Sequence, residues 1–257
     1  MEIAANDLIA PMLALWLPFV RILAFLTFCP ILDNRALPKK AKILLAIMLS
    51  MLMTPHIAVN PLQRELMSVS MLLLTGEQIL WGWLFGHMCY WVFWALQAAG
   101  AILSMNMGLG MAVMNDPANG SSTMVISQII YVYSALLFFG MEGHLLLVTI
   151  LHKGFVYWPI GQAINDLTLR TFATGFSWIL TGALLLALPT LFIMLLVQGV
   201  FGLLNRVSPT LNLFSLGFPI SMLFGLFCLW VLSGSVSDHY LQLTNRLLAL
   251  FDSLRRY

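Results

Sequence analysis

The chain has 257 residues, of which 61% are hydrophobic and only 9% are charged, and its mean hydropathy is +0.94. These values exclude an ordinary soluble domain and are typical of a membrane protein that crosses the bilayer several times. A net charge of +2, spread along the chain, does not suit a nucleic-acid-binding protein. We therefore expect an all-α fold of polytopic helical hairpins.

Six apolar runs follow one another, separated by segments in which the charges collect. The first run is too long for the apolar core of a cleavable signal, and Glu2 and Asp7 stand where such a signal is basic. We therefore expect the first helix to be retained. The runs cover about residues 8–32, 43–59, 69–104, 124–151, 172–204 and 211–234.

The third run, 69–104, is much longer than the roughly 20 residues that span a bilayer. If the segments rich in lysine and arginine all lie in the cytoplasm, this run begins and ends on the same side of the membrane. We therefore predict a bent hairpin of two half-helices, with Gly82, Gly86 and Gly100 as places to bend. The alternative is one steeply tilted or protruding helix.

Prolines stand inside nearly every other run, and each removes a helix hydrogen bond and clashes with the preceding turn. In lipid, a broken backbone is tolerated only where protein or a water-filled cavity satisfies it. We therefore predict broken half-helices packed largely against other protein, with ordinary proline kinks in a lipid-facing bundle as the alternative. The prolines are Pro11, Pro18, Pro30, Pro55, Pro189 and Pro219.

The last segment of the chain has a different pattern, in which apolar residues recur at spacings of three and four with polar residues between them. This pattern predicts an amphipathic helix with a narrow apolar seam. Such a helix lies on a membrane surface or pairs with a partner helix, and the sequence does not separate the two. The seam consists of Val236, Tyr240, Leu243, Leu247, Leu250 and Leu254.

Ionisable side chains within the apolar runs are the first candidates for chemistry, because each is costly in a bilayer unless it is paired or hydrated. They are Arg21, Glu77, His87, Glu142 and His144. Glu142 and His144 fall on different faces of a helix, as do Glu77 and His87. Because the sequence also has no catalytic or metal-binding motif, we expect no enzyme activity, no metal and no cofactor.

A proton-coupled membrane carrier stays an alternative, since Glu77, Glu142 and the histidines could form a relay at mid-depth. Six uneven runs without inverted halves fit such carriers poorly. We favour a structural role in which Glu77 and Glu142 cap half-helices, or meet Arg21 or a basic residue of another subunit.

Between the third and fourth runs, residues 104–123 read SMNMGLGMAVMNDPANGSST and contain no lysine or arginine. Residues 115–117 and 119–120 are turn formers. A loop at membrane depth must line or block a cavity, because lipid would leave its amides unpaired. Methionine adapts to unlike surfaces and glycine lets the backbone turn. We predict a deformable apolar seal, with a plain extracytoplasmic loop as the alternative.

Four motifs resemble the FliR family of flagellar biosynthetic proteins, and the similarity runs through most of the chain. The family consists of type III export gate subunits and is similar to the T component of injectisomes. The last of the motifs looks closer to the flagellar branch. They are Met107-Gly-Leu-Gly-Met, Asp116-Pro-x-x-Gly, Gly143-His-Leu-Leu-Leu in a turn after Glu142, and Arg206-Val-Ser-Pro-Thr-Leu-Asn-Leu-Phe-Ser-Leu-Gly-Phe-Pro-Ile.

The resemblance implies a core subunit that forms and plugs a pore for unfolded flagellar substrates. It implies one such chain with five FliP and four FliQ subunits, binding to FlhB, and a place in the bacterial inner membrane at the flagellar basal body. Residues 1–170 would be FliP-like and 171–257 FliQ-like. Part of the assembly would lie above the membrane plane, so several runs need not cross lipid. The bent hairpin was predicted on the assumption that every run crosses the bilayer, and the resemblance does not support that assumption.

The resemblance also implies site residues. The pore plug would comprise Met105, Met107, Gly108, Gly110, Met111, Met114, Asn115, Asp116 and Pro117. The subunit assembly motif would comprise Arg206, Pro209, Asn212, Phe214, Gly217 and Pro219.

Overall fold

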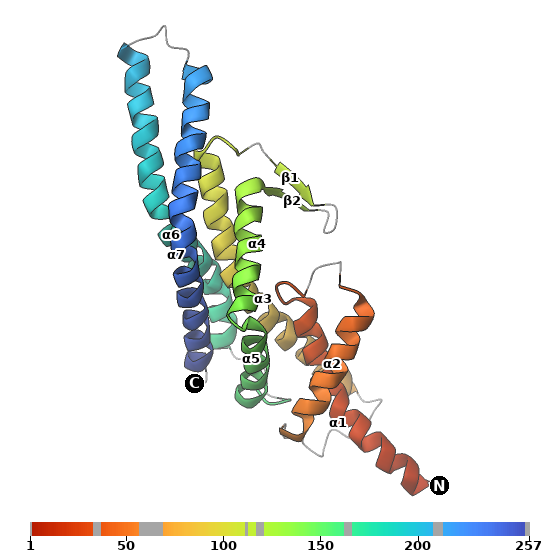
Figure 1. Cartoon of the computed structure of the whole chain (residues 1–257). Helices are drawn as coiled ribbons and strands as arrows, with labels where there is room; N and C mark the ends of the chain where they lie inside the picture. Colours follow the sequence, from red (N-terminus) through yellow and green to blue (C-terminus); the bar gives the residue numbers. More distant parts are fainter. Residues whose placement is uncertain are drawn as a thin grey trace. The chain divides into compact units, whose positions relative to one another are not determined.

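The computed structural model describes residues 2–32, 37–56, 69–110, 113–116, 121–161, 166–207 and 213–254 (Figure 1). In this part of the chain the elements are α1 (Glu2–Thr27), α2 (Lys39–Met53), the 3₁₀ helix η1 (Thr54–His56), α3 (Val69–Asn106), β1 (Val113–Asp116), β2 (Ser121–Met124), α4 (Val125–Gly140), α5 (Gly143–Tyr157), α6 (Asp166–Val207) and α7 (Leu213–Leu254). The predicted helical fold is confirmed, with one short β-hairpin added to it.

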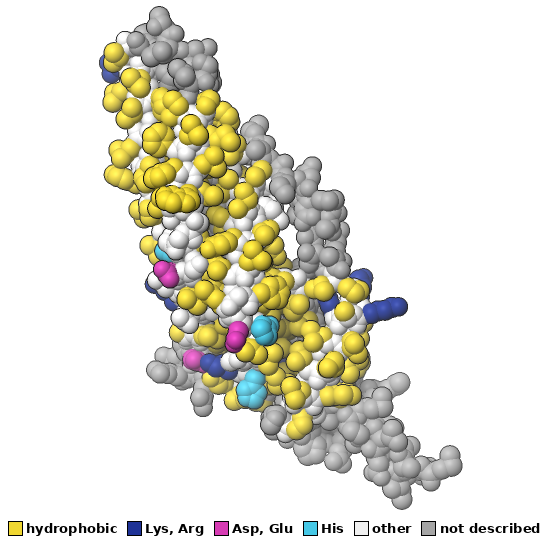
Figure 2. Space-filling model, in the orientation of Figure 1, with side chains coloured by type: hydrophobic (Ala, Val, Ile, Leu, Met, Phe, Trp, Pro, Cys, Tyr) yellow, Lys and Arg dark blue, Asp and Glu magenta, His cyan; other side chains and the backbone are white. Residues whose placement is uncertain are grey.

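Several of the described helices are long and apolar enough to cross a membrane. Three qualify by length and composition, namely Val69–Asn106, Phe172–Val207 and Gly217–Asp252. The pair α4 and α5 makes a fourth if it is counted as one broken span. Figure 2 shows hydrophobic side chains covering most of the visible face of α6 and α7. These features suit a polytopic membrane protein.

The chain divides into two compact units, each assembled from separate segments. Unit 1 contains Met1–Tyr90, Glu142–Thr174 and Leu247–Tyr257, and unit 2 contains Trp91–Met141 and Gly175–Arg246. The helices α3, α6 and α7 therefore contribute to both units. The predicted division at residues 170 and 171 concerns likeness to partner subunits and stays a prediction.

Helix α3 runs from Val69 to Asn106 without a break, so the predicted bent hairpin is wrong and the alternative of one long helix holds. Its glycines serve close packing instead. In unit 1, a Cβ at Gly82 would lie 2.7 Å from the Cβ of Ala24, and one at Gly86 would lie 2.9 Å from the carbonyl oxygen of Phe28. The missing side chains let α1 approach the α3 backbone closely.

Most of the prolines do not break the helices in which they lie, contrary to our expectation. Helices α6 and α7 continue through Pro189 and Pro219, and α1 contains Pro11 and Pro18. A long helix keeps its other backbone hydrogen bonds when one is lost, and neighbouring groups can satisfy the freed carbonyl. Of these prolines, Pro30 follows the end of α1, and Pro55 lies in the 3₁₀ helix η1 that follows α2.

The break among the apolar helices lies between α4 and α5, at Met141 and Glu142, whereas the residues after Glu142, where the motif suggested a turn, begin helix α5. Glu142 itself adopts the left-handed conformation, with φ of +55°. This conformation is uncommon for a residue with a side chain. A left-handed residue ends the helical course of the backbone, so the chain can start a new helix at Gly143.

The core of unit 1 is built around Arg21, a fully buried residue of α1. Its Nε donates a hydrogen bond to Gln78 Oε1 at 2.7 Å. Its Nη1 donates to the carbonyl oxygens of Gly154 at 3.2 Å and Trp158 at 2.8 Å. The guanidinium carbon lies 4.6 Å from the ring centroid of Phe155. One side chain therefore ties α1 to α3 and to the end of α5.

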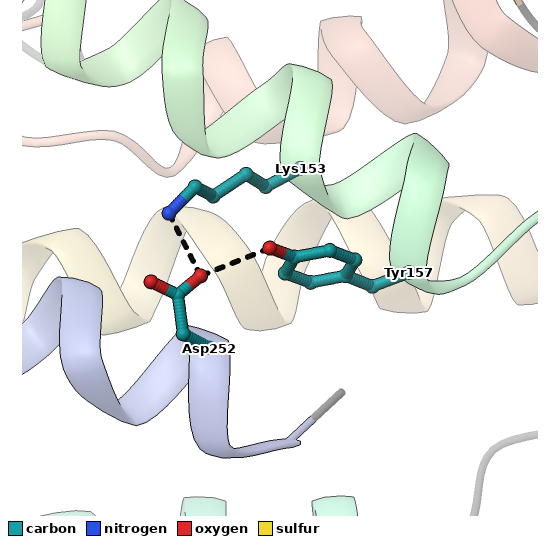
Figure 3. Close-up of polar contacts among 3 residues, drawn as sticks. All are labelled: Lys153, Tyr157 and Asp252. Atoms are coloured by element: carbon teal, nitrogen blue, oxygen red, sulfur yellow. Dashed lines mark hydrogen bonds and ion pairs between the residues drawn. The ribbon is translucent and has the colours of Figure 1, made fainter. Parts of the chain in front are cut away.

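Aromatic rings pack around this polar centre. The ring centroid of Trp158 lies 5.3 Å from that of Trp81 and 5.4 Å from that of Phe85, and Phe85 lies 5.5 Å from Phe251 of α7. At the edge of unit 1, Lys153 Nζ lies 2.7 Å from Asp252 Oδ1, and the hydroxyl of Tyr157 donates to the same oxygen at 3.0 Å (Figure 3). These contacts join α5 to the last turns of α7.

Unit 2 is held together by aromatic side chains and by glycines that receive them. Gly175 of α6 stands against the indole of Trp91, whose Cε2 would lie 2.6 Å from a Cβ at this position. Phe93 of α3 contacts Phe138 of α4 and Tyr240 of α7, with ring centroids 6.1 and 6.3 Å away. These contacts pack α3, α4, α6 and α7 together.

The apolar seam predicted near the end of the chain is confirmed, as part of the longer helix α7. Of its members, Val236, Tyr240, Leu243 and Leu247 are buried. Other parts of this same chain bury them. This differs from the two environments that we expected, a membrane surface and a partner helix.

We expect Gly82→Ala to destabilise unit 1, because the new methyl group would overlap the α1 backbone. Overpacking of this kind costs about 1–3 kcal/mol. Gly76→Ala is the matched control, since a Cβ at this position of the same helix has nothing within 4 Å. It should raise stability by up to about 1 kcal/mol through helix propensity. Thermal unfolding in detergent should show midpoint shifts of opposite sign, and a raised midpoint for Gly82→Ala would contradict the packing argument.

We expect Arg21→Leu to lower the free energy of unfolding by on the order of 3 kcal/mol, because it leaves the buried Gln78 side chain and the carbonyl oxygen of Trp158 without the hydrogen bonds that Arg21 donates. Arg170→Leu is the control, since Arg170 pairs with Asp166 on an exposed part of α6. Such a pair contributes about 0.5 kcal/mol or less. If the two variants unfolded at the same temperature, Arg21 would not be the centre of unit 1.

Candidate functional site

The Met- and Gly-rich stretch leaves α3 through a Schellman cap. The amide of Leu109 donates to the carbonyl of Ser104 at 2.9 Å, and the amide of Gly108 donates to that of Met105 at 3.1 Å. Gly108 has a φ of +78°, which glycine adopts readily and other residues do not. The buried hydroxyl of Ser104 also donates to the carbonyl of Leu109 at 3.2 Å. Residues 104–109, here named the loop root, therefore have a defined course.

The side chain of Met107 anchors the loop root on α7. It is 0% exposed and fills the space where Gly225 has no side chain. A Cβ at Gly225 would overlap Met107 Cγ and lie 2.7 Å from its Sδ and 2.8 Å from its Cε. We name this space the Gly225 socket.

A second contact on the same helix supports the first. A Cβ at Gly108 would lie 3.1 Å from two ring carbons of Phe218. Gly225 follows Phe218 by about two helical turns, so both residues lie on one face of α7. This face of α7 therefore receives two consecutive residues of the loop root.

Helix α6 also holds the loop root. The side-chain amide Nε2 of Gln198 donates to the carbonyl of Asn106 at 3.1 Å. The Asn106 side chain donates in turn to the carbonyl of Ile102 at 2.7 Å, one turn earlier in α3. The end of α3 is thus bound to both α6 and α7 within unit 2.

Beyond the loop root, the stretch forms an antiparallel β-hairpin and not the irregular loop that we expected. The pairs are Val113 with Met124, Met114 with Thr123, Asn115 with Ser122 and Asp116 with Ser121. Strand β2 passes directly into α4, and the Thr123 hydroxyl donates to Gln128 Oε1 at 3.2 Å. The turn-forming residues were predicted, but the four-residue strands have too little β-propensity to be recognised.

The predicted plug residues occupy different environments. The side chain of Met105 is 62% exposed, whereas that of Met107 is buried. Gly108 is exposed and Gly110 is half-buried. Strand β1 contains Met114, Asn115 and Asp116, while Met111 and Pro117 lie outside the described residues. In this structure Met107 is an anchor, and a sealing role for the other plug residues stays a prediction.

The predicted assembly motif lies across the end of α6 and the start of α7. Arg206 is exposed in the last turn of α6. Phe214, Gly217 and Pro219 belong to α7, and Pro209 and Asn212 lie outside the described residues. Phe218, within the same motif, contacts the loop root.

The ionisable candidates do not form one cluster. Glu77 accepts a hydrogen bond from Trp81 Nε1 at 3.3 Å, and Arg21 bonds to Gln78 and not to Glu77. Glu142 and His144 are exposed, and the Glu142 side chain makes no capping hydrogen bond to α5. Among the residues that the structure describes, no group of three His, Cys, Asp or Glu side chains could hold a metal ion.

The sequence analysis did not single out Gly225, Phe218 or Gln198. A glycine in the middle of an apolar helix is a signal of close helix packing. That signal could have identified Gly225 as a contact site, but it could not have named Met107 as the residue it receives.

Comparison with known proteins gives consistent matches along the chain. The FliR flagellar biosynthetic protein of Escherichia coli (strain K12) is 34% identical over 210 residues, covering 81% of this chain and 80% of the relative. That of Pectobacterium carotovorum subsp. carotovorum is 32% identical over 216 residues, covering 84% and 82%. The Yop proteins translocation protein T of Yersinia pestis is 30% identical over 235 residues, covering 87% and 88%.

A family model, described as bacterial export proteins, family 1, matches residues 12–247. The match includes the loop root, the β-hairpin and the α7 face that carries Phe218 and Gly225. By the length of this match and the identity to its relatives, the chain belongs to the bacterial export proteins, family 1.

Proposed function

We propose that this chain is a non-enzymatic subunit of a type III protein export gate, in which residues 104–123 plug the pore for unfolded flagellar substrates. The observation that carries the proposal is the loop root, where α3, α6 and α7 together fix the start of a Met- and Gly-rich segment. A segment with a fixed base and adaptable side chains suits a seal that must close tightly and then yield.

The names of the relatives support an export function and favour the flagellar branch. Those at 34% and 32% identity are flagellar biosynthetic proteins, and the one at 30% is a translocation protein. An injectisome subunit of the same family is the closest alternative. No observation favours a proton-coupled carrier, because the structure does not join Glu77 to Glu142 or His144.

The proposed assembly contains five FliP and four FliQ subunits with one copy of this chain, and it binds FlhB. Exposed apolar side chains on α6 and α7, such as Leu195 and Leu203 at 67% and Trp230 at 71%, support burial in lipid or against such neighbours. The consecutive helices α6 and α7 would be the FliQ-like hairpin of residues 171–257, following a FliP-like part of residues 1–170. We place the assembly in the inner membrane at the flagellar basal body, partly above the membrane plane.

Deleting Met114–Thr123 and joining Val113 to Met124 should make cells leaky to small ions and dyes, because it removes the second half of the plug segment. Val113 and Met124 are paired across the hairpin. Paired Cα atoms lie about 4.5–5.5 Å apart, close to the roughly 3.8 Å of a peptide link, so the junction strains the backbone little. Dye uptake by cells that contain the assembled gate measures the leak.

Met114→Leu is the control for this deletion, because it keeps apolar volume at one plug position, and cells with it should stay tight. Co-purification of the other gate subunits shows whether each variant assembles. Tight cells with an assembled, hairpin-deleted gate would remove the plug from the proposed function.

A further inference from the structure

We propose that the Gly225 socket is a latch, in which α7 holds the loop root through Met107 and releases it when α7 shifts. The inference rests on the proposed function, since a latch on this loop has a role only if the loop is the plug. It identifies α7 as the helix that controls the plug, and the contact between Met107 and Gly225 as the means by which α7 does so.

Met107 is the strongest attachment of the loop root outside α3. Its side chain is 0% exposed, whereas the Gln198 hydrogen bond to Asn106 is exposed. An exposed hydrogen bond competes with water and contributes little, whereas a fully buried methionine side chain makes many van der Waals contacts with the atoms around it. The socket therefore accounts for most of the attachment to α6 and α7.

The socket accepts Met107 only at one position of α7. The neighbours of Gly225 are Phe224 and Leu226, whose side chains offer no such space. A rotation or slide of α7 by one residue would replace the missing side chain with a large one, and it would also move Phe218 away from Gly108. Packed helices have discrete arrangements and do not deform continuously. A small movement of α7 therefore converts into release of the loop root.

Gly225→Ala tests the latch by adding one methyl group inside the socket. The group would meet the flexible end of Met107, so we expect the side chain to leave the socket while the helices stay folded. Dye uptake by cells with the assembled gate should rise by about tenfold. This is the factor by which overpacking should lower the ratio of molecules with Met107 in the socket to molecules with Met107 outside it. Gly234→Ala on the same helix is the control, because a Cβ there has nothing within 4 Å, and it should stay tight.

A reversible crosslink provides a second test, in which Met107→Cys shortens the side chain that meets position 225. In a Cys228→Ala background, we combine Met107→Cys with Gly225→Cys, so that a disulfide joins the loop root to α7. We expect oxidised cells to stop exporting substrate and reduced cells to resume, while the Met107→Cys single variant exports in both conditions. This test decides the question if Gly225→Ala does not assemble.

The outcomes separate the latch from the plug. Equal export with the crosslink formed and reduced overturns the latch, because the loop root and α7 would then never need to part. If the hairpin deletion leaks in that case, the plug still stands. If the hairpin deletion stays tight, the plug fails and the latch fails with it.

Discussion

Close approach at glycines is the constraint on which this structure depends. Nearly every helix face is apolar, so hydrophobicity cannot decide which faces pack, and shape decides instead. Gly82 admits the backbone of α1, Gly154 admits the ring of Phe85, Gly175 admits Trp91 and Gly225 admits Met107. At each position a missing side chain leaves room for a backbone or a ring or a methionine side chain, so each contact has only one place to form.

Arg21 provides specificity of a different kind. A buried cation that donates to Gln78 and to two carbonyl oxygens at the end of α5 has few alternative positions, because any shift breaks these hydrogen bonds. Glycine notches determine how closely the helices pack, and this polar centre determines which helices meet in unit 1. Among its described residues, the site in unit 2 has no buried cation, and the loop root is held there by the contacts at Gly225 and Gly108 and by one exposed hydrogen bond from Gln198.

Residue patterns predicted the helical fold and the seam from Val236 to Leu247, because each follows from local periodicity. The continuous course of α3 was not predicted, since a packing glycine and a bending glycine look the same in a sequence. The prolines within α6 and α7 were misjudged for the related reason that tertiary packing outweighs one lost hydrogen bond. At the site, the motif identified the loop, but the burial of Met107 depends on a residue far along the chain.

Unit 1 takes its parts from the beginning, the middle and the last residues of the sequence. Phe251 stacks on Phe85, and Asp252 binds Lys153 and Tyr157, although these partners are synthesised long before. Vectorial synthesis therefore leaves the aromatic surface around Trp158 uncovered until residue 251 has left the ribosome. Nascent chains of this protein should expose that surface to membrane-insertion factors from the synthesis of Trp158 until that of Phe251.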